Sequence, residues 1–209
     1  DPACRLLAEE SGRRVIDADA TPIPKISVPG KHMQRNAQLA ASLAKELGIS
    51  QDAAQQSLKQ YKGCWRRMEL KGTYNSIPVI DDYGHHPTEV KATISAVKEA
   101  YPDKRLVCVF QPHMHDRTLK LYDEFLESFA FVDVLIIPNI YDARSDVERE
   151  HVDVDKFVSD IKEHGPKNVL NGKSLRETET LLAEMLQPND VLLCMGAGDI
   201  TDLAEWMVA

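Results

Sequence analysis

The sequence predicts an α/β fold built on a doubly wound, mostly parallel sheet, preceded by a smaller helical region. From about residue 72, short apolar segments alternate with amphipathic ones, and such alternation is typical of parallel strands joined by helices. The apolar segments are hydrophobic on successive residues, as expected where helices cover both faces of a sheet. The first part of the chain lacks this alternation. We therefore expect two domains, 1–71 and 72–209.

Composition limits the possible functions. The 209 residues are 43% hydrophobic and 28% charged, with a formal net charge of −8. This is enough apolar content for a packed core, which disfavours intrinsic disorder. An acidic chain is not expected to bind nucleic acid as its main partner, although it can hold nucleotides at local anion sites. No apolar run approaches the roughly 18 residues of a membrane-spanning helix, so we expect no membrane insertion.

Cysteine placement favours a reducing compartment. Cys108 and Cys194 lie in apolar runs, where buried free thiols are usual, and Cys4 and Cys64 are distant from them in the sequence. The N-terminus is charged and carries no apolar signal region. We therefore expect a cytoplasmic protein.

The first region reads as helices separated by loops. Residues 3–11 fit a helix, 13–17 fit a short strand, and a proline-punctuated stretch follows. A helix begins at Lys31 and stops at Gly48, which suits a C-terminal cap. Ser50 is a typical N-cap for the next helix. The helix that begins at Lys31 has an apolar face: Ala37, Leu39, Ala40, Leu43, Ala44 and Leu47.

The second region begins with a predicted β-hairpin over residues 68–82 and a helix that starts near Pro87. Later strands are expected at 105–110, 132–138, 167–171 and 190–195. Later helices are expected at 117–129, 154–164, 174–186 and 200–208.

Unusual residues follow the strands of this region. They occupy the segments 81–89, 111–118, 139–144 and 196–200. In open α/β sheets the ligand crevice lies outside the carboxyl ends of the strands, so we expect a site there. Two histidine pairs, His85 with His86 and His113 with His115, fall in these segments together with Tyr83, Arg117 and aspartates.

Several interpretations of these segments stay open at this point. Thr88 and Asp116 could be helix caps, and Gly196 and Gly198 could merely permit a tight turn. The histidines could bind a metal, although their spacing does not match a closed zinc site. Alternatively, His, Tyr and Arg could hold a carboxylate and orient an amine, while an aspartate at a strand end accepts hydrogen bonds from ribose.

Two further features lie before the sheet. His32 and Asn36 are four residues apart and project from one helical face; that turn could equally be a plain exposed first turn. The pair Arg66 and Arg67 follows a glycine-containing turn, where an arginine could meet a phosphate or simply lie on the surface.

Together, these segments resemble the Mur ligases, the ATP-dependent amide-bond-forming enzymes of peptidoglycan assembly. PGKHMQRNAQLAASLAKELGI is similar to the family's PG-x-HN-x-x-NALAA helix, and YKGCWRRMELKG to its F-x-G-x-x-RR-x-E segment. VIDDYGHHPTEVKATISAVKEAYP, VFQPH with the later RT, and GAGDI resemble the members that add L-alanine to UDP-N-acetylmuramate.

The resemblance implies a fold and an activity. Residues 1–71 would be the end of the central ATP-binding domain, and 72–209 the C-terminal, Rossmann-like, amino-acid-binding domain. ATP would phosphorylate the muramoyl carboxylate, and L-alanine would attack the acyl phosphate. The family's phosphate loop, G-x-x-GKT[ST], is not in these residues. We expect it upstream with the main Mg²⁺ ligands, which would leave this chain inactive alone.

The resemblance also implies site residues. The nucleotide-binding set is His32, Asn36, Arg67 and Asp82, with the first two at adenine, Arg67 at the γ-phosphate and Asp82 at ribose. The amino-acid set is Tyr83, His85, His113 and Arg117, with Arg117 on the alanine carboxylate. No residue of this chain is assigned as a metal ligand. Met33 and Met114 depart from the family pattern, which implies a changed amino-acid affinity or choice. The alternatives are a non-catalytic nucleotide- or amino-acid-binding module and a histidine-rich metal hydrolase.

Overall fold

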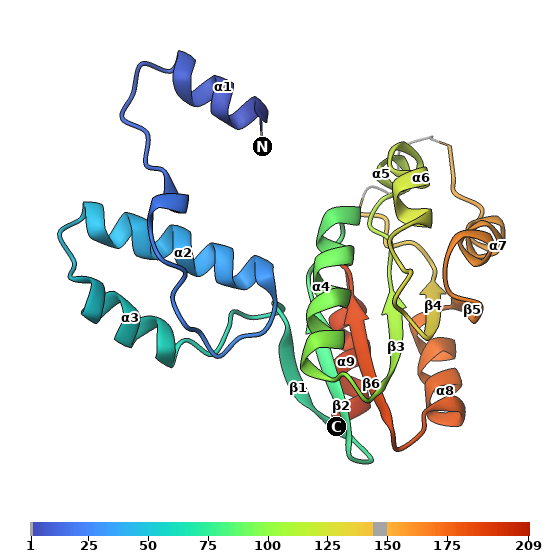
Figure 1. Ribbon diagram of the computed structural model, residues 1–209. Coiled ribbons are helices and arrows are strands. Elements are labelled where there is room, and N and C mark those ends of the chain that lie inside the picture. The colour runs from blue at the N-terminus through green and yellow to red at the C-terminus, as the bar shows by residue number, and fades with distance from the viewer. Residues whose placement is uncertain (1, 144–149) are drawn as a thin grey trace. The chain divides into compact units, whose positions relative to one another are not determined.

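The computed structural model describes residues 2–143 and 150–209 (Figure 1). The chain forms two compact units, 1–62 and 63–209. The sequence places the boundary later, at residue 71. The difference arises because the strand β1, Glu69–Tyr74, pairs with β2, Ile77–Asp82, and so joins the sheet of the second unit.

The first unit is helical. Its elements are α1 (Pro2–Glu10), the 3-10 helix η1 (Ala18–Ala20), α2 (Lys31–Glu46) and α3 (Gln51–Gln60). The Ser50 hydroxyl accepts a hydrogen bond from the Ala53 N–H at 3.3 Å, so the predicted cap is confirmed. Gly48, with φ at +78°, follows the end of α2 as expected. The predicted strand over 13–17 is wrong. Asp17 instead caps η1, because its carboxylate accepts the Asp19 N–H at 3.0 Å.

The buried face of α2 differs from the predicted apolar face. Met33 and Ala37 are buried, and so are the polar Gln38 and Ser42. The Gln38 side chain donates to the carbonyl of Thr21 at 2.6 Å, which links α2 to the preceding loop. The leucines of the predicted face are each more than half exposed: Leu39, Leu43 and Leu47.

The second unit is built on a six-stranded sheet. Its remaining strands are β3 (Arg105–Phe110), β4 (Val134–Pro138), β5 (Val169–Lys173) and β6 (Asp190–Met195). Its helices are α4 (Pro87–Ala100), α5 (His115–Lys120), α6 (Tyr122–Leu126), α7 (Val154–His164), α8 (Leu175–Met185) and α9 (Ile200–Val208). The strand order is β1-β2-β6-β3-β4-β5. Only β1 runs antiparallel to its neighbour, so the predicted mostly parallel sheet is confirmed.

Helices cover both faces of this sheet, as the unbroken apolar strands predicted. Leu106, Cys108 and Phe110 of β3 pack in one core, with residues of α4, α6 and α7. Val107 and Val109 pack in the other, with α8 and α9. β3 therefore sends alternate side chains to opposite cores. Cys108 and Cys194 are buried free thiols, as expected, and burial raises the pKa of both.

The helix predicted over 117–129 is interrupted. Leu121 has φ −112° and ψ 20°, outside helical values, and separates α5 from α6. Beyond the break, the rings of Phe125 and Phe129 lie 5.4 Å and 5.3 Å from that of Phe110. No proline or glycine marks the break, so the sequence contained no signal for it.

Within the described ranges, no helix has the length and apolar character that crossing a membrane requires.

Candidate functional site

The carboxyl edge of the sheet is joined together by loop-to-loop hydrogen bonds. The N–H of Gly196 donates to the carbonyl of Asp82 at 3.0 Å, and the N–H of Tyr141 donates to the carbonyl of Pro112 at 2.9 Å. His113 forms a parallel bridge with Tyr141. The loops that follow the strands therefore hold fixed positions relative to one another, as a preorganised site requires.

The four residues of the predicted amino-acid set lie together at this edge. The rings of Tyr83 and His85 meet edge-on at 5.5 Å, and those of His85 and His113 lie 6.0 Å apart. Arg117 Nη1 is 3.4 Å from His113 Nδ1. Tyr141, which the sequence did not single out, stacks on His113 at 5.5 Å. The loop after β2, the loop after β3 and the start of α5 thus supply one continuous row of side chains.

The environment of His113 keeps its ring uncharged. Burial lowers its pKa, and the positive charge of Arg117 and the nearby His85 lower it further. The ordinary value is about 6.5. His113 is therefore neutral at neutral pH, while the guanidinium of Arg117 carries the positive charge beside it.

Arg67 and Glu89 lie at the Tyr83 end of the row. The Arg67 guanidinium is 5.6 Å from the Tyr83 ring centre and 3.6 Å from a Glu89 oxygen. Partial burial acts to raise the pKa of Glu89, but the N–H groups of His85 and His86 and the nearby positive charge hold it below its usual value. Glu89 is thus an anion that orients Arg67.

Helix caps differ from those considered on sequence. His86, rather than Thr88, caps α4: its Nδ1 accepts the Thr88 N–H at 3.3 Å, and Glu89 closes the box by accepting the His86 N–H at 3.2 Å. Asp116 lies inside the first turn of α5 and is not its cap.

The carboxylate of Asp82, which the resemblance assigns to ribose, accepts hydrogen bonds within the second unit. The residue is 2% exposed. One carboxylate oxygen accepts the Gly84 N–H at 2.8 Å and the Thr93 hydroxyl at 3.2 Å, and the other accepts the Met68 N–H at 2.9 Å. Burial raises the pKa of this carboxyl. The side chain therefore accepts three hydrogen bonds from inside the second unit.

The four histidines do not form one cluster. Only His85 and His113 approach each other in the row. His115 Nδ1 accepts the Val152 N–H at 3.0 Å, and its ring packs edge-on against His151 at 4.4 Å. Among residues 2–143 and 150–209, no group of three or more His, Cys, Asp or Glu side chains could hold a metal ion.

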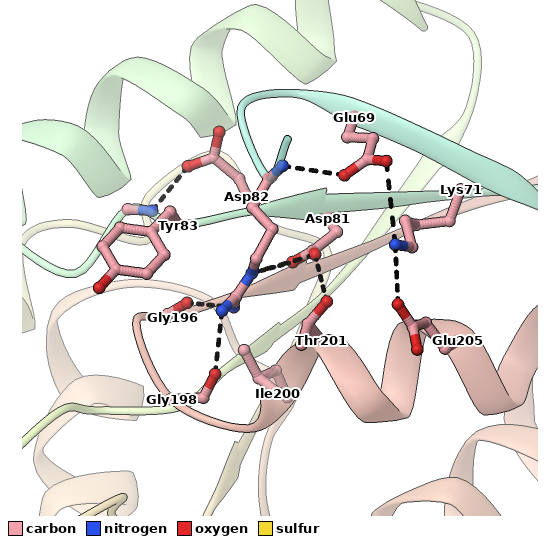
Figure 2. A network of polar contacts seen from close by, with 12 residues as sticks. Glu69, Lys71, Asp81, Asp82, Tyr83, Gly196, Gly198, Ile200, Thr201 and Glu205 are labelled. Carbon is pink, nitrogen blue, oxygen red and sulfur yellow. Dashed lines mark hydrogen bonds and ion pairs between the residues drawn. The ribbon is translucent and has the colours of Figure 1, made fainter. Parts of the chain in front are cut away.

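Arg66 is a residue whose importance the sequence did not reveal. Figure 2 shows the polar network around Asp81, Thr201 and the carbonyls of Gly196 and Gly198. Arg66 donates to Asp81 and to both glycine carbonyls. The carbonyls of Gly196 and Gly198 are therefore engaged in internal hydrogen bonds. A Cβ on Gly198 would lie 2.4 Å from Tyr141 Cγ.

A cavity of about 360 Å³ opens beside Tyr141 at the same edge. It is lined by Gln111, Pro138, Asn139, Ile140, Tyr141, Asp142, Lys173, Ser174, Leu175, Arg176, Asp199 and Trp206. This volume is at the lower end of the range for small-molecule sites. Arg144, the last residue of the predicted polar segment, lies outside the described residues.

The other two nucleotide candidates lie in the first unit. His32 and Asn36 sit four residues apart in α2. Asn36 lines a small, largely apolar pocket of about 270 Å³ with Met33, Ala37, Ala40, Leu58 and Tyr61. An amide beside apolar walls is a chemically suitable surface for a flat heterocycle. The predicted nucleotide set is thus divided, with two residues in each unit.

Residues 66–198, more than half of the chain, match the family described as Mur ligase, glutamate ligase domain. The chain belongs to the Mur ligase family. The chain is 44% identical over 183 residues to the UDP-N-acetylmuramate–L-alanine ligase of Desulforapulum autotrophicum. The aligned residues cover 88% of this chain and 40% of that protein. The chain is 42% identical over 180 residues to the protein of the same name from Persephonella marina, with coverage of 86% and 39%.

A solved structure agrees with this assignment. UDP-N-acetylmuramate-alanine ligase from Thermotoga maritima superposes with a TM-score of 0.73 at 25% identity, covering 88% of this chain and 39% of that one. This Mur ligase therefore spans about 40% of the length of the curated relatives that it matches.

Proposed function

We propose that this chain is part of an ATP-dependent ligase that joins L-alanine to UDP-N-acetylmuramate. It would supply the amino-acid-binding part and some of the nucleotide-binding part. The reaction would take place in the cytoplasm, during peptidoglycan synthesis. The observation that carries the proposal is the row formed by His85, His113 and Arg117 at the carboxyl edge of the sheet. The relatives named after this reaction support it.

In this reaction a carboxylate oxygen of UDP-N-acetylmuramate forms a bond to the γ-phosphorus of ATP, the bond from that phosphorus to the β-phosphate oxygen breaks, and ADP leaves, which yields the acyl phosphate. The amino group of L-alanine then attacks the acyl carbon. A C–N bond forms, the C–O bond to phosphate breaks, and inorganic phosphate leaves with the electron pair as the amine loses a proton. Positioning and charge stabilisation carry most of such a reaction.

The row of side chains suits the amino-acid substrate. A guanidinium can pair with a carboxylate through two parallel hydrogen bonds, so Arg117 would hold the carboxylate of L-alanine. His113 is neutral, because its pKa is lowered, and so adds no positive charge that would repel the amino group. Tyr83 and His85 would close the pocket around the small methyl side chain.

Each unit carries residues that we assign to the nucleotide. In the second unit, Arg67, oriented by Glu89, would contact the γ-phosphate. In the first unit, His32 and Asn36 would contact adenine beside the apolar pocket of α2. We assign 1–62 to the end of the central ATP-binding domain. Among the described residues, no group of three or more His, Cys, Asp or Glu side chains could hold the Mg²⁺ that the resemblance implies.

The test is a titration of this chain with L-alanine, followed by the imidazole resonances of His85 and His113 in NMR spectra. We expect saturable shifts of both rings. Arg117→Met should abolish them, because a charge-assisted hydrogen bond to the carboxylate contributes roughly 1.5–3 kcal/mol. Removing Arg117 should also raise the pKa of His113, since one of the charges that lowers it is lost.

Lys120→Met is the matched control, because Lys120 is an exposed cation on the same helix. It should leave the titration unchanged. Glycine and D-alanine, added in parallel, report the amino-acid choice. Shifts that do not saturate, or that persist in Arg117→Met, would refute the proposed amino-acid site.

A further inference from the structure

Arg66 is a buried arginine in the loop that precedes β1. Its side chain is 4% exposed, and that of its partner Asp81 is completely buried. Nε lies 3.3 Å and 3.1 Å from the two Asp81 oxygens. Nη1 donates to the carbonyl of Gly198 at 3.0 Å, and Nη2 to that of Gly196 at 2.6 Å. One planar guanidinium therefore joins the end of β2 to the loop after β6.

The backbone around Arg66 is tied to the same place. The carbonyl of Arg66 accepts the Tyr83 N–H at 2.7 Å. Its own N–H donates to Glu69 at 2.8 Å, and the N–H of Met68 donates to Asp82 at 2.9 Å. The loop is thus fixed to the carboxyl end of β2 on both sides of Arg67.

The conformation of this loop needs such support. Arg66 and Met68 have φ values of +52° and +51°, in the left-handed region that side chains seldom adopt. Such backbone persists only where the surrounding structure holds it. The arginine pair is accordingly divided: Arg66 points into the network, whereas the side chain of Arg67 is 43% exposed.

The contacts of Arg66 lead directly to the candidate site. Its guanidinium carbon lies 5.1 Å from the centre of the Tyr83 ring, and that of Arg67 lies 5.6 Å from the same ring. Tyr83 in turn meets His85 edge-on at 5.5 Å. Any displacement of Arg66 would therefore reach the row of side chains through Tyr83.

We propose that Arg66 is a positioning residue, which sets the places of Arg67 and of the Tyr83 ring by locking the loop before β1 onto Asp81 and the carbonyls of Gly196 and Gly198. Arg66 itself contacts no substrate. The roles of Arg67 and Tyr83 rest on the proposed function, whereas the positional effect does not.

The test is Arg66→Lys in this chain. Lysine keeps the charge but has no planar fork to reach three groups of acceptors. We expect loss of the nuclear Overhauser cross-peaks between the Tyr83 and His85 rings. We also expect exchange of the Tyr83 amide to accelerate by up to about tenfold, the factor that corresponds to one hydrogen bond.

Arg105→Lys is the matched control. Arg105 also holds an aspartate through two bonds, both of 2.7 Å to Asp190, and donates to the carbonyl of Met185 at 3.2 Å. These contacts lie at the starts of β3 and β6, at the opposite edge of the sheet. The control should leave the Tyr83 and His85 signals in place.

If Arg66→Lys does not fold, the double variant Arg66→Met with Asp81→Asn replaces it, because that pair leaves no unpaired buried charge. Retained cross-peaks in a folded variant, or equal loss in Arg105→Lys, would overturn the proposal. Titration of the same samples with L-alanine separates the two proposals: an unmodified chain that fails to bind counts against the function, while its ring signals still judge Arg66.

Discussion

The two compact units contain similar amphipathic helices but enclose very different cores. In the second unit, α4 and α9 cover opposite faces of a sheet whose central strand β6 is buried along its whole length. In the first unit, α2 carries an equally regular row of leucines, yet Leu39, Leu43 and Leu47 stay exposed. The comparison shows that apolar periodicity predicts a helix reliably, but predicts its buried face only where a second layer covers it.

The largest expected contrast comes from Phe110→Ala. Phe110 is completely buried between Phe125 and Phe129, and such truncations destabilise by about 3–5 kcal/mol. In native-state hydrogen exchange, the amides of β3 and β6 should lose protection from exchange by the same free energy. The amides of α2 and α3 should keep their protection. Equal loss in both units would mean that they unfold as one.

Gly198→Ala should have the next largest effect. The added Cβ would lie 2.4 Å from Tyr141 Cγ and 2.7 Å from Gln111 Oε1, and overpacking of this kind costs about 1–3 kcal/mol. Gly48→Ala is its counterpart in the first unit. It meets nothing within 4 Å but keeps φ at +78°, so only backbone strain of about 1 kcal/mol is expected. Urea titration of both variants measures the difference, and a larger loss at Gly48 would reverse the comparison.

Helix caps should matter equally in the two units. The Ser50 hydroxyl accepts the Ala53 N–H, and the Ser174 hydroxyl accepts the Glu177 N–H at 3.2 Å. Each change to alanine should destabilise its helix by about 1 kcal/mol. Exchange of the first-turn amides of α3 and α8 provides the measurement. A much larger effect at Ser50 would show that the caps of the first unit carry more of its stability.

The smallest effect is expected for Leu43→Gln. Because Leu43 is 53% exposed, its replacement should change the free energy of unfolding by less than about 0.5 kcal/mol. Leu182→Gln in α8, where the side chain is completely buried, serves as the contrasting variant and should unfold the second unit far more readily. Matching losses would mean that Leu43 has a buried partner.

Local sequence signals predicted most elements well. Two strands and two helices appear with the expected bounds: 105–110, 190–195, 154–164 and 200–208. In these segments the apolar pattern keeps one period until a clear cap or turn residue ends it. The strand at 13–17 and the unbroken helix at 117–129 failed. In both places short-range propensity was overridden, by the carboxylate of Asp17 and by the turn at Leu121.

The candidate site was predictable as a place, but only partly as a set of residues. The carboxyl edge follows from topology alone, and it brings Tyr83, His85, His113 and Arg117 together. Burial cannot be read from a residue's type. A pair of arginines therefore gave no indication that Arg66 turns inward, nor did two adjacent aspartates indicate that Asp82 is enclosed.

The position of β6 in the sheet has a consequence for the order in which the chain folds. Residues 190–195 lie between β2 and β3 and pair with both. A ribosome releases these residues after all the other strands, so until then β2 and β3 lack the neighbour that joins them. Before β6 is synthesised, β1 can pair only with β2, and β3 and β5 only with β4. Each of these two groups then has an open edge that can pair with another chain. β6, the last of these six strands to be synthesised, therefore joins the two strands whose following loops carry the candidate site.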